Sequence, residues 1–173
     1  MSGAPPVPPE PAVPPEPAVR PPVQGKRKRA ASRLASVQAL YQMDVAAKGL
    51  NEVFAEFETH WMGQEVEGVE YEQADVEFFK RVISGVLEDQ VALDRATDKL
   101  LADGWPLRRV EAVMRAVFRA AAFELKKRKD IPARVVITEY VDVAAAFLAK
   151  EEVGMINAVL DKLAREYRAS EFT

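Results

Sequence analysis

The chain lacks cysteine and contains a single histidine, His60. Without cysteine it forms no disulfide and offers neither a thiolate metal ligand nor a thiol nucleophile. One imidazole is too few for a multi-histidine zinc site, so we expect no metal and no cofactor. No apolar run approaches the ~18 residues that a membrane-spanning helix needs, and residues 1–24 lack the apolar stretch of a signal peptide. These absences predict a cytoplasmic protein.

Signatures of catalysis are absent as well. The sequence has no glycine-rich phosphate loop, no GxSxG turn and no HExxH pair. Most carboxylates lie at surface positions of predicted helices, but Glu124 and Glu139 lie in helices that are otherwise apolar. A buried carboxylate needs a basic partner, and Arg119 is off the favoured spacing from Glu124. We therefore expect a structural ion pair with another helix, and we assign no catalytic residue.

Proline is nearly absent from the body of the chain. Of the 12 prolines, only Pro106 and Pro132 lie beyond Gly25, and the tail contains the sequence PPEPAV twice. Proline has no amide donor and holds φ near −65°, so residues 1–25 are predicted to form a disordered, extended tail. Such a composition is typical of a semi-rigid spacer. A ligand for a proline-recognising domain is the alternative.

Positive charge is concentrated in one place. Residues 1–33 contain six basic and two acidic residues, a net charge of +4, whereas the whole chain has −3 and the remainder therefore −7. The basic residues are Lys26, Arg27, Lys28, Arg29, Arg33 and Arg20. A basic arm ahead of an acidic body is typical of a protein that binds a polyanion. A solubilising charge run and a nuclear-import signal are the alternatives.

Apolar residues recur at helical spacing from Ser32 onward. The pattern predicts helices over about 32–48, 51–61, 73–102, 106–129, 136–147 and 155–167, with a loop at 62–72. The first helix is expected to bury Leu34, Val37, Leu40, Tyr41 and Val45. Gly49 is expected to end this helix, and Asn51 to begin the next. No segment alternates with period two for long, so the fold class is all-α.

Several ordered stretches resemble the NusB family of transcription antitermination factors. They are SVQALYQMD at 36–44, FFKRVISGV at 78–86, the long motif at 113–144 that contains Arg119, Glu124, Pro132 and Glu139, and INAVLDKLARE at 156–166. The resemblance extends over residues 26–168. It implies a bundle of about seven helices, with an N-terminal subdomain at about 30–103 and a C-terminal one at about 105–170, within a domain spanning 26–170.

The resemblance also implies a function without catalysis. Family members bind boxA-containing single-stranded RNA of ribosomal RNA operon leaders together with NusE, a small-subunit ribosomal protein. The complex joins the elongating RNA polymerase and suppresses premature termination. Some members form homodimers. The second hypothesis for this chain is therefore a protein-interaction or dimerisation module in which RNA binding is secondary or lost, with Val53, Phe54, Phe57 and Trp61 covered by a partner instead of by the core.

Site residues follow from the same resemblance. Arg29 and Arg33 match the arginine-rich start of the family's first helix, Lys26, Arg27 and Lys28 extend it, and Gln38 on that helix is placed to read a base edge. The second RNA-facing region corresponds to residues 151–155, with Glu151 and Met155. Where the family commonly has Phe, which stacks on bases, this chain has Met155. Where the family commonly has the dipeptide Phe-Gly, this chain has Phe147-Leu148.

Overall fold

The computed structural model describes residues 3–4, 21–60, 65–66, 69–70, 75–101, 106–107 and 110–173; the side chains of residues 21–27, 60, 65–66 and 69–70 stand outside this description. These residues form six α-helices: α1 (Pro21–Ala46), α2 (Leu50–His60), α3 (Val76–Asp98), α4 (Ala112–Lys127), α5 (Ala133–Ala145) and α6 (Lys150–Tyr167). A short 3₁₀ helix, η2 (Ala169–Phe172), follows α6. The two-residue strands β1 (Glu65–Val66) and β2 (Val69–Glu70) pair antiparallel within the predicted loop.

The all-α prediction is confirmed, with six α-helices in the described residues where about seven were expected. Most of the proline-rich tail and Trp61 lie outside the described residues. The division into two subdomains stays a prediction. Buried residues of all six α-helices form one hydrophobic cluster or pack against it.

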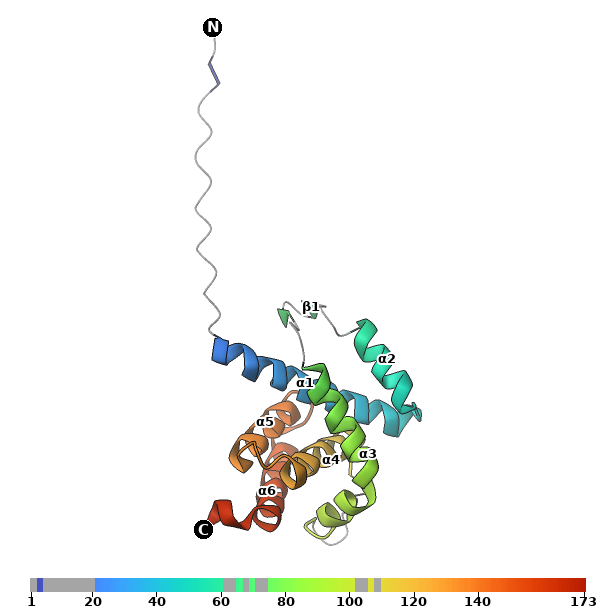
Figure 1. Cartoon of the computed structure of the whole chain (residues 1–173), viewed down its shortest axis with the longest axis vertical. Helices are drawn as coiled ribbons and strands as arrows, with labels where there is room; N and C mark the ends of the chain where they lie inside the picture. Colours follow the sequence, from blue (N-terminus) through green and yellow to red (C-terminus); the bar gives the residue numbers. More distant parts are fainter. Residues whose placement is uncertain are drawn as a thin grey trace.

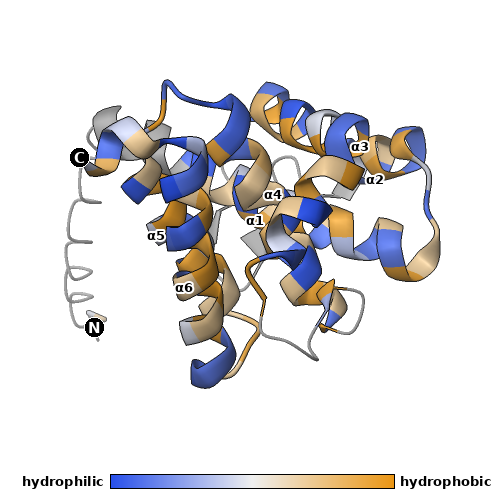
Figure 2. Ribbon diagram, turned by 90° about the horizontal axis from the view of Figure 1, so that it is seen from below, coloured by the Kyte–Doolittle hydropathy of each residue, from blue (hydrophilic) through white to orange (hydrophobic). Residues whose placement is uncertain are grey.

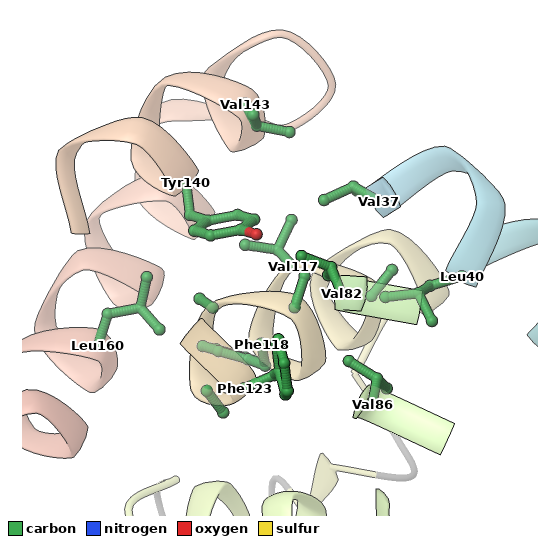
Figure 3. Packing of buried hydrophobic residues seen from close by; sticks show 14 of the residues in the cluster. Val37, Leu40, Val82, Val86, Val117, Phe118, Phe123, Tyr140, Val143 and Leu160 are labelled. Atoms are coloured by element: carbon green, nitrogen blue, oxygen red, sulfur yellow. The ribbon is translucent and has the colours of Figure 1, made fainter. Parts of the chain in front are cut away.

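Helix α4 lies at the centre of this cluster. It contacts α1, α3, α5 and α6, and almost every residue from Met114 to Leu125 is buried. Most of these side chains are apolar, and the charged ones among them pair with neighbouring helices, as burial of a charge requires. Figure 1 shows the other helices around α4, and the colouring of Figure 2 shows hydrophobic and hydrophilic residues alternating along them. In Figure 3, Val37 of α1 and Val82 of α3 approach Val117 of α4, while Tyr140 of α5 lies over the same helix.

Helix α1 is longer at its start than the periodicity indicates. It begins at Pro21, so residues 21–25 are helical and belong to no extended tail. Proline suits the first position of a helix because its missing N–H would have no partner there. The first basic segment, which we define as residues 26–29, therefore lies on a helix that continues without a break into the core.

The end of α1 differs from the prediction for a physical reason. The helix stops at Ala46, and Ala47 adopts the left-handed conformation with φ of 53°, the only non-glycine residue in the described chain to have a positive φ. Gly49 has the other role: its carbonyl accepts the first α2 hydrogen bond, from the N–H of Val53 at 3.1 Å. Gly49 thus caps the start of α2, and Asn51 lies inside that helix.

The predicted buried face of α1 is correct only over its first half. Val37 and Leu40 are buried, and Leu34 packs against the core. Tyr41 is 38% exposed and Val45 59% exposed, so the expectation that both pack in the core is wrong. The apolar period continues along the helix beyond the part that other helices cover.

The boundaries of α3 and α4 have identifiable causes. The Asp75 side chain accepts a hydrogen bond from the N–H of Phe78 at 3.0 Å and so caps α3. Helix α4 begins at Ala112 and not at Pro106, whose neighbour Leu107 is buried in a short turn. Gly85 marks close helix packing, because a Cβ added there would lie 2.0 Å from the ring of Phe123.

Candidate nucleic-acid interface

The first basic segment lies on α1, ahead of the part that packs in the core. Lys28 and Arg29 are half-buried, and Lys28 forms no ion pair among the described residues. The backbone of Lys26 and Arg27 is helical, while their side chains lie outside the described residues. In Figure 1 this end of α1 extends past α3 on the side where α5 lies. A helix holds successive cations at fixed spacing, which suits contact with a run of phosphates.

Arg33 is not on this surface, and its assignment to RNA contact is corrected by its position. Its side chain is 2% exposed and forms a two-point ion pair with Glu124 of α4, with Nε–Oε2 and Nη2–Oε1 distances of 2.9 Å. Its Nη1 lies 3.9 Å from a carboxylate oxygen of Glu139 on α5. The ion pair between helices that the sequence predicts for Glu124 is confirmed. Arg33 therefore positions the basic segment and is not itself open to a phosphate.

The groups around Arg33 keep its guanidinium protonated although it is buried. Burial lowers the pKa of its guanidinium, but the hydrogen bonds and charge of Glu124 outweigh burial, so the pKa is raised above its usual value. Tyr140 of α5 is completely buried beside the pair, and burial together with the charge of Glu124 raises the pKa of its hydroxyl. The hydroxyl group therefore stays neutral. These groups join α1, α4 and α5 directly behind the basic segment.

Three guanidinium groups surround the buried ring of Phe78 at the start of α3. Arg29 lies 5.5 Å from the ring centroid, Arg33 5.1 Å and Arg128 5.2 Å. The face of an aromatic ring attracts cations, which offsets part of the repulsion among the three. Asp130 adds a negative charge: it accepts hydrogen bonds from Nε and Nη2 of Arg128 at 3.0 and 2.9 Å. Phe78 thus brings the start of α1 and the end of α4 together.

The pKa of Asp130 reflects this arrangement. Hydrogen bonds from Arg128 contribute most to lowering the pKa of the carboxyl group to about 2, and the charge of Arg29 also contributes. Asp130 remains ionised at all physiological pH values, and so does Arg128, whose pKa is raised mainly by the same hydrogen bonds.

Gln38 lies where α1 faces α2, with its amide oxygen turned away from solvent. Its Oε1 atom is buried without a hydrogen-bond partner in the described residues, and the side chain lines a small gap between α1 and α2. The gap also touches Phe57 and Phe79, whose rings stack at 3.8 Å. Gln38 as a whole is half-buried, and the reading of a base edge by this residue stays a prediction.

The start of α6 has a different character. Glu151 is exposed, whereas Met155 is half-buried and packs against the core. Glu152 accepts a hydrogen bond from the N–H of Ala149 at 3.2 Å and so caps the helix. Phe147, in the turn before α6, is 45% exposed and is the aromatic side chain that this region presents. Residues 147–155 follow the C-terminal end of α5, whereas Arg128 and Asp130 precede the N-terminal end of the same helix.

Other charges of the described core are already paired. Arg115 and Arg119 of α4 bind Asp44 of α1, and Arg119 also binds Asp94 of α3 at 2.9 Å. This network joins three helices. No group of three or more His, Cys, Asp or Glu side chains in the described residues is arranged to hold a metal ion. None of the described helices combines the length and the apolar character needed to cross a membrane.

Sequence reasoning missed a second set of cations. Lys127, Lys129 and Arg134, at the end of α4 and the start of α5, are exposed and form no ion pair among the described residues. The run KKRK at 126–129 is visible in the sequence. At the end of a helix, however, such a run is explained by its favourable interaction with the helix dipole, so it gave no reason to expect RNA contact. Tyr41 was missed for a related reason, because its spacing matches buried positions.

Comparison with known proteins agrees with the fold. The model of the NusB family matches residues 30–165, a range that begins directly after Arg29. A protein of Rhodopseudomonas palustris strain HaA2 described as "Transcription antitermination protein NusB" is 60% identical over 156 residues, which cover 88% of this chain and 92% of the relative.

Solved structures show the same architecture. NusB of T. maritima has a TM-score of 0.69 and 29% sequence identity, covering 83% of this chain and 96% of the other. A chain from a structure described as antitermination factors NusB and NusE in complex with dsRNA has a TM-score of 0.68 at 20% identity, covering 82% of this chain and 98% of the other. At that identity the likeness extends to the fold alone.

Proposed function

Since the chain belongs to the NusB family of transcription antitermination proteins, we propose that it binds boxA-containing single-stranded RNA of ribosomal RNA operon leaders together with NusE. The resulting complex joins the elongating RNA polymerase in the cytoplasm and suppresses premature termination. The observation that carries the proposal is the family match over residues 30–165, with the first basic segment on a rigid helix at its edge.

Contacts to phosphates supply most of the affinity. Lys and Arg side chains that bind phosphates release counterions from the RNA, and this term is insensitive to sequence. Lys28 and Arg29, with Lys26 and Arg27 directly before them in α1, are the residues we assign to it. The ion pairs of Arg33 with Glu124 and Glu139 hold α1 against α4 and α5 one turn beyond these cations, so that the backbone of the segment starts from a fixed part of the helix.

Base recognition requires groups that stack on unpaired bases or bind their edges. We assign this task to the start of α6, where Glu151 is exposed and Met155 half-buried. Methionine has no ring, and the neighbouring Phe147 supplies an exposed one. Stacking on Phe147, with Met155 covering the edge of the base, fits the side chains that are present.

NusE is the proposed protein partner. The structural neighbour described as NusB and NusE with dsRNA has the same fold over nearly its whole length. On this chain, Tyr41 and Val45 give α1 an exposed apolar stripe beyond the part that packs in the core. Aromatic residues are enriched in protein interfaces, which makes this stripe the surface we assign to a protein partner.

Titration with RNA tests the proposal. BoxA-containing RNA and a scrambled RNA of equal length are added to the protein, with and without purified NusE. We expect tighter binding of boxA RNA and a further gain in affinity when NusE is present. Equal affinity for both RNAs under every condition would remove the sequence-specific function and leave the family assignment intact.

The second hypothesis is an interaction module with RNA binding lost or secondary. Val53 and Phe57, which it assigned to a partner, are buried in the core, and Phe54 packs against it, so the exposed Tyr41 and Val45 are the apolar surface that supports this hypothesis. Light scattering separates the two. A stable homodimer whose mass changes with neither NusE nor RNA favours the interaction module, whereas a monomer that forms a ternary complex favours antitermination.

A further inference from the structure

We infer that the RNA backbone follows a second basic segment, formed by Lys127, Lys129 and Arg134 at the connection between α4 and α5, as a continuation of the first. This inference rests on the proposed RNA binding and extends it to residues that the family resemblance does not assign. The ligand group is the phosphate of single-stranded RNA.

The two basic segments converge through Phe78. Arg29 belongs to the first segment and Arg128 lies between Lys127 and Lys129, and their guanidinium groups lie 5.5 and 5.2 Å from the centroid of one ring. The charge of Arg29 also acts on Asp130, the next residue but one after Arg128. Residues about a hundred positions apart in the chain therefore come close together at Phe78.

Stabilisation of α4 does not require these cations. The last carbonyl groups of a helix lack partners within it, and a cation near them is favourable. Arg168, which is 4% exposed, already supplies that cation: its Nη2 donates to the carbonyl oxygens of Glu124 at 2.9 Å and Arg128 at 2.6 Å, and its Nε donates to that of Leu125 at 2.8 Å. Lys127 and Lys129 are left exposed beyond this cap.

Arg134 lies where a cation opposes helix stability. It is in the first turn of α5, the positive end of the helix dipole, where acidic side chains are favoured and none is present. The acidic groups that face this connection are occupied. Asp130 pairs with Arg128, and Glu171 pairs with Arg168 at 3.2 Å and accepts a hydrogen bond from the N–H of Ala133 at 3.1 Å.

This surface therefore has positive charges that lack an acidic partner within the described residues. Of the four basic residues at 126–129, Lys126 binds Asp89 and Arg128 binds Asp130, so that Lys127 and Lys129 remain. Three unpaired cations next to a segment that binds phosphates extend the field that an RNA chain meets. Because phosphate contacts carry no sequence information, the second segment adds affinity equally for every RNA.

The test is the salt dependence of RNA binding by the full chain. In the variant Lys127→Gln/Lys129→Gln/Arg134→Gln, the loss of three single-strand phosphate contacts makes the negative slope of log K against log salt shallower by about 2. The same loss weakens binding about 100-fold at 0.1 M salt. We expect the change for boxA and scrambled RNA alike. The charge-preserving variant Lys127→Arg/Lys129→Arg/Arg134→Lys keeps the slope.

The control removes exposed cations elsewhere. Arg95 and Lys99 are exposed near the C-terminal end of α3, and Lys99 lies ~30 Å along the helix from Phe78 at 1.5 Å per residue. Arg95→Gln/Lys99→Gln leaves the slope unchanged. An unchanged slope in the triple variant, with wild-type binding that depends on salt, would overturn the inference and leave the proposed function standing. Weaker NusE binding at an unchanged RNA slope would overturn it in favour of a protein partner, and absence of RNA binding in the wild type would overturn both.

Discussion

Arg33 of α1 and Glu124 of α4, 91 positions apart in the chain, form a two-point ion pair that is almost completely shielded from water. Breaking one side of a buried pair leaves an uncompensated charge, which costs more than the pair itself contributes. The pair lies directly behind the first basic segment, so it couples the stability of the core to the position of the proposed RNA surface.

Arg33→Met is therefore expected to lower the free energy of unfolding by about 3–5 kcal/mol, because Glu124 stays buried without a partner. The double variant Arg33→Met/Glu124→Leu removes both charges and is expected to recover most of that loss. Urea denaturation followed by circular dichroism measures both. If the single and double variants lose the same stability, the ion pair is not the cause of the loss.

Arg168 is expected to be equally intolerant of a conservative change. Its guanidinium donates to four carbonyl oxygens, those of Glu124, Leu125, Arg128 and Ile131. Lysine has no planar fork and three donors, so Arg168→Lys is expected to cost about 3 kcal/mol, since hydrogen bonds to charged groups are worth about 1.5–3 kcal/mol each.

The matched control is Arg165→Lys on α6, an exposed residue that pairs with Asp161. Surface substitutions usually change stability by less than about 0.5 kcal/mol. Thermal unfolding compares the two variants, and equal melting temperatures would contradict the capping role of Arg168.

Gly85 tests the packing of α3 on α4. A methyl group there meets Phe123 at 2.0 Å, so Gly85→Ala is expected to destabilise by about 1–3 kcal/mol through overpacking, although alanine is the better helix former. Gly154 in α6 has open space around it, and Gly154→Ala is expected to stabilise by up to ~1 kcal/mol. Opposite signs in chemical denaturation support the packing, and a stabilising Gly85→Ala would contradict it.

Acid pH tests the pairing of Arg128 with Asp130. The pKa of Asp130 is lowered to about 2 in the folded protein, mainly by hydrogen bonds from Arg128. A lowered pKa stabilises the fold above the unfolded-state value near 4, and this contribution is lost as the pH falls toward 2. At pH 7 the melting temperature of the wild type is therefore expected to exceed that of Asp130→Asn, by a small margin because the pair is exposed. This difference in melting temperature should shrink between pH 4 and pH 2. A difference that is constant with pH would refute the ionic cause.

Helical periodicity alone predicted most of the core. The helices now seen as α4, α5 and α6 follow from apolar spacing, and the need of Glu124 for a partner on another helix follows from the cost of burying a charge. The prediction from periodicity was wrong at Tyr41 and Val45. Spacing shows which residues lie on the same face of a helix, but it does not show how far the neighbouring helices cover that face.

The candidate site was predictable only in part. Both basic runs are visible in the sequence, but spacing along one helix cannot show that Arg33 turns inward to α4 while Arg29 stays near the surface. Nor can it show that residues 126–129 lie beside the first basic segment, because Phe78 on a third helix brings them together. Contacts between residues far apart in the sequence determine both the burial of Arg33 and the position of residues 126–129.

The role of α1 in RNA binding is tested by the salt dependence of boxA RNA binding, measured for the wild type and for Lys26→Gln/Arg27→Gln/Lys28→Gln. This variant removes three cations from the first basic segment and leaves Arg29 on Phe78. With the loss of three single-strand phosphate contacts, we predict that the negative slope of log K against log salt becomes shallower by about 2, at an unchanged melting temperature. A slope equal to that of the wild type would show that α1 does not present this segment to RNA.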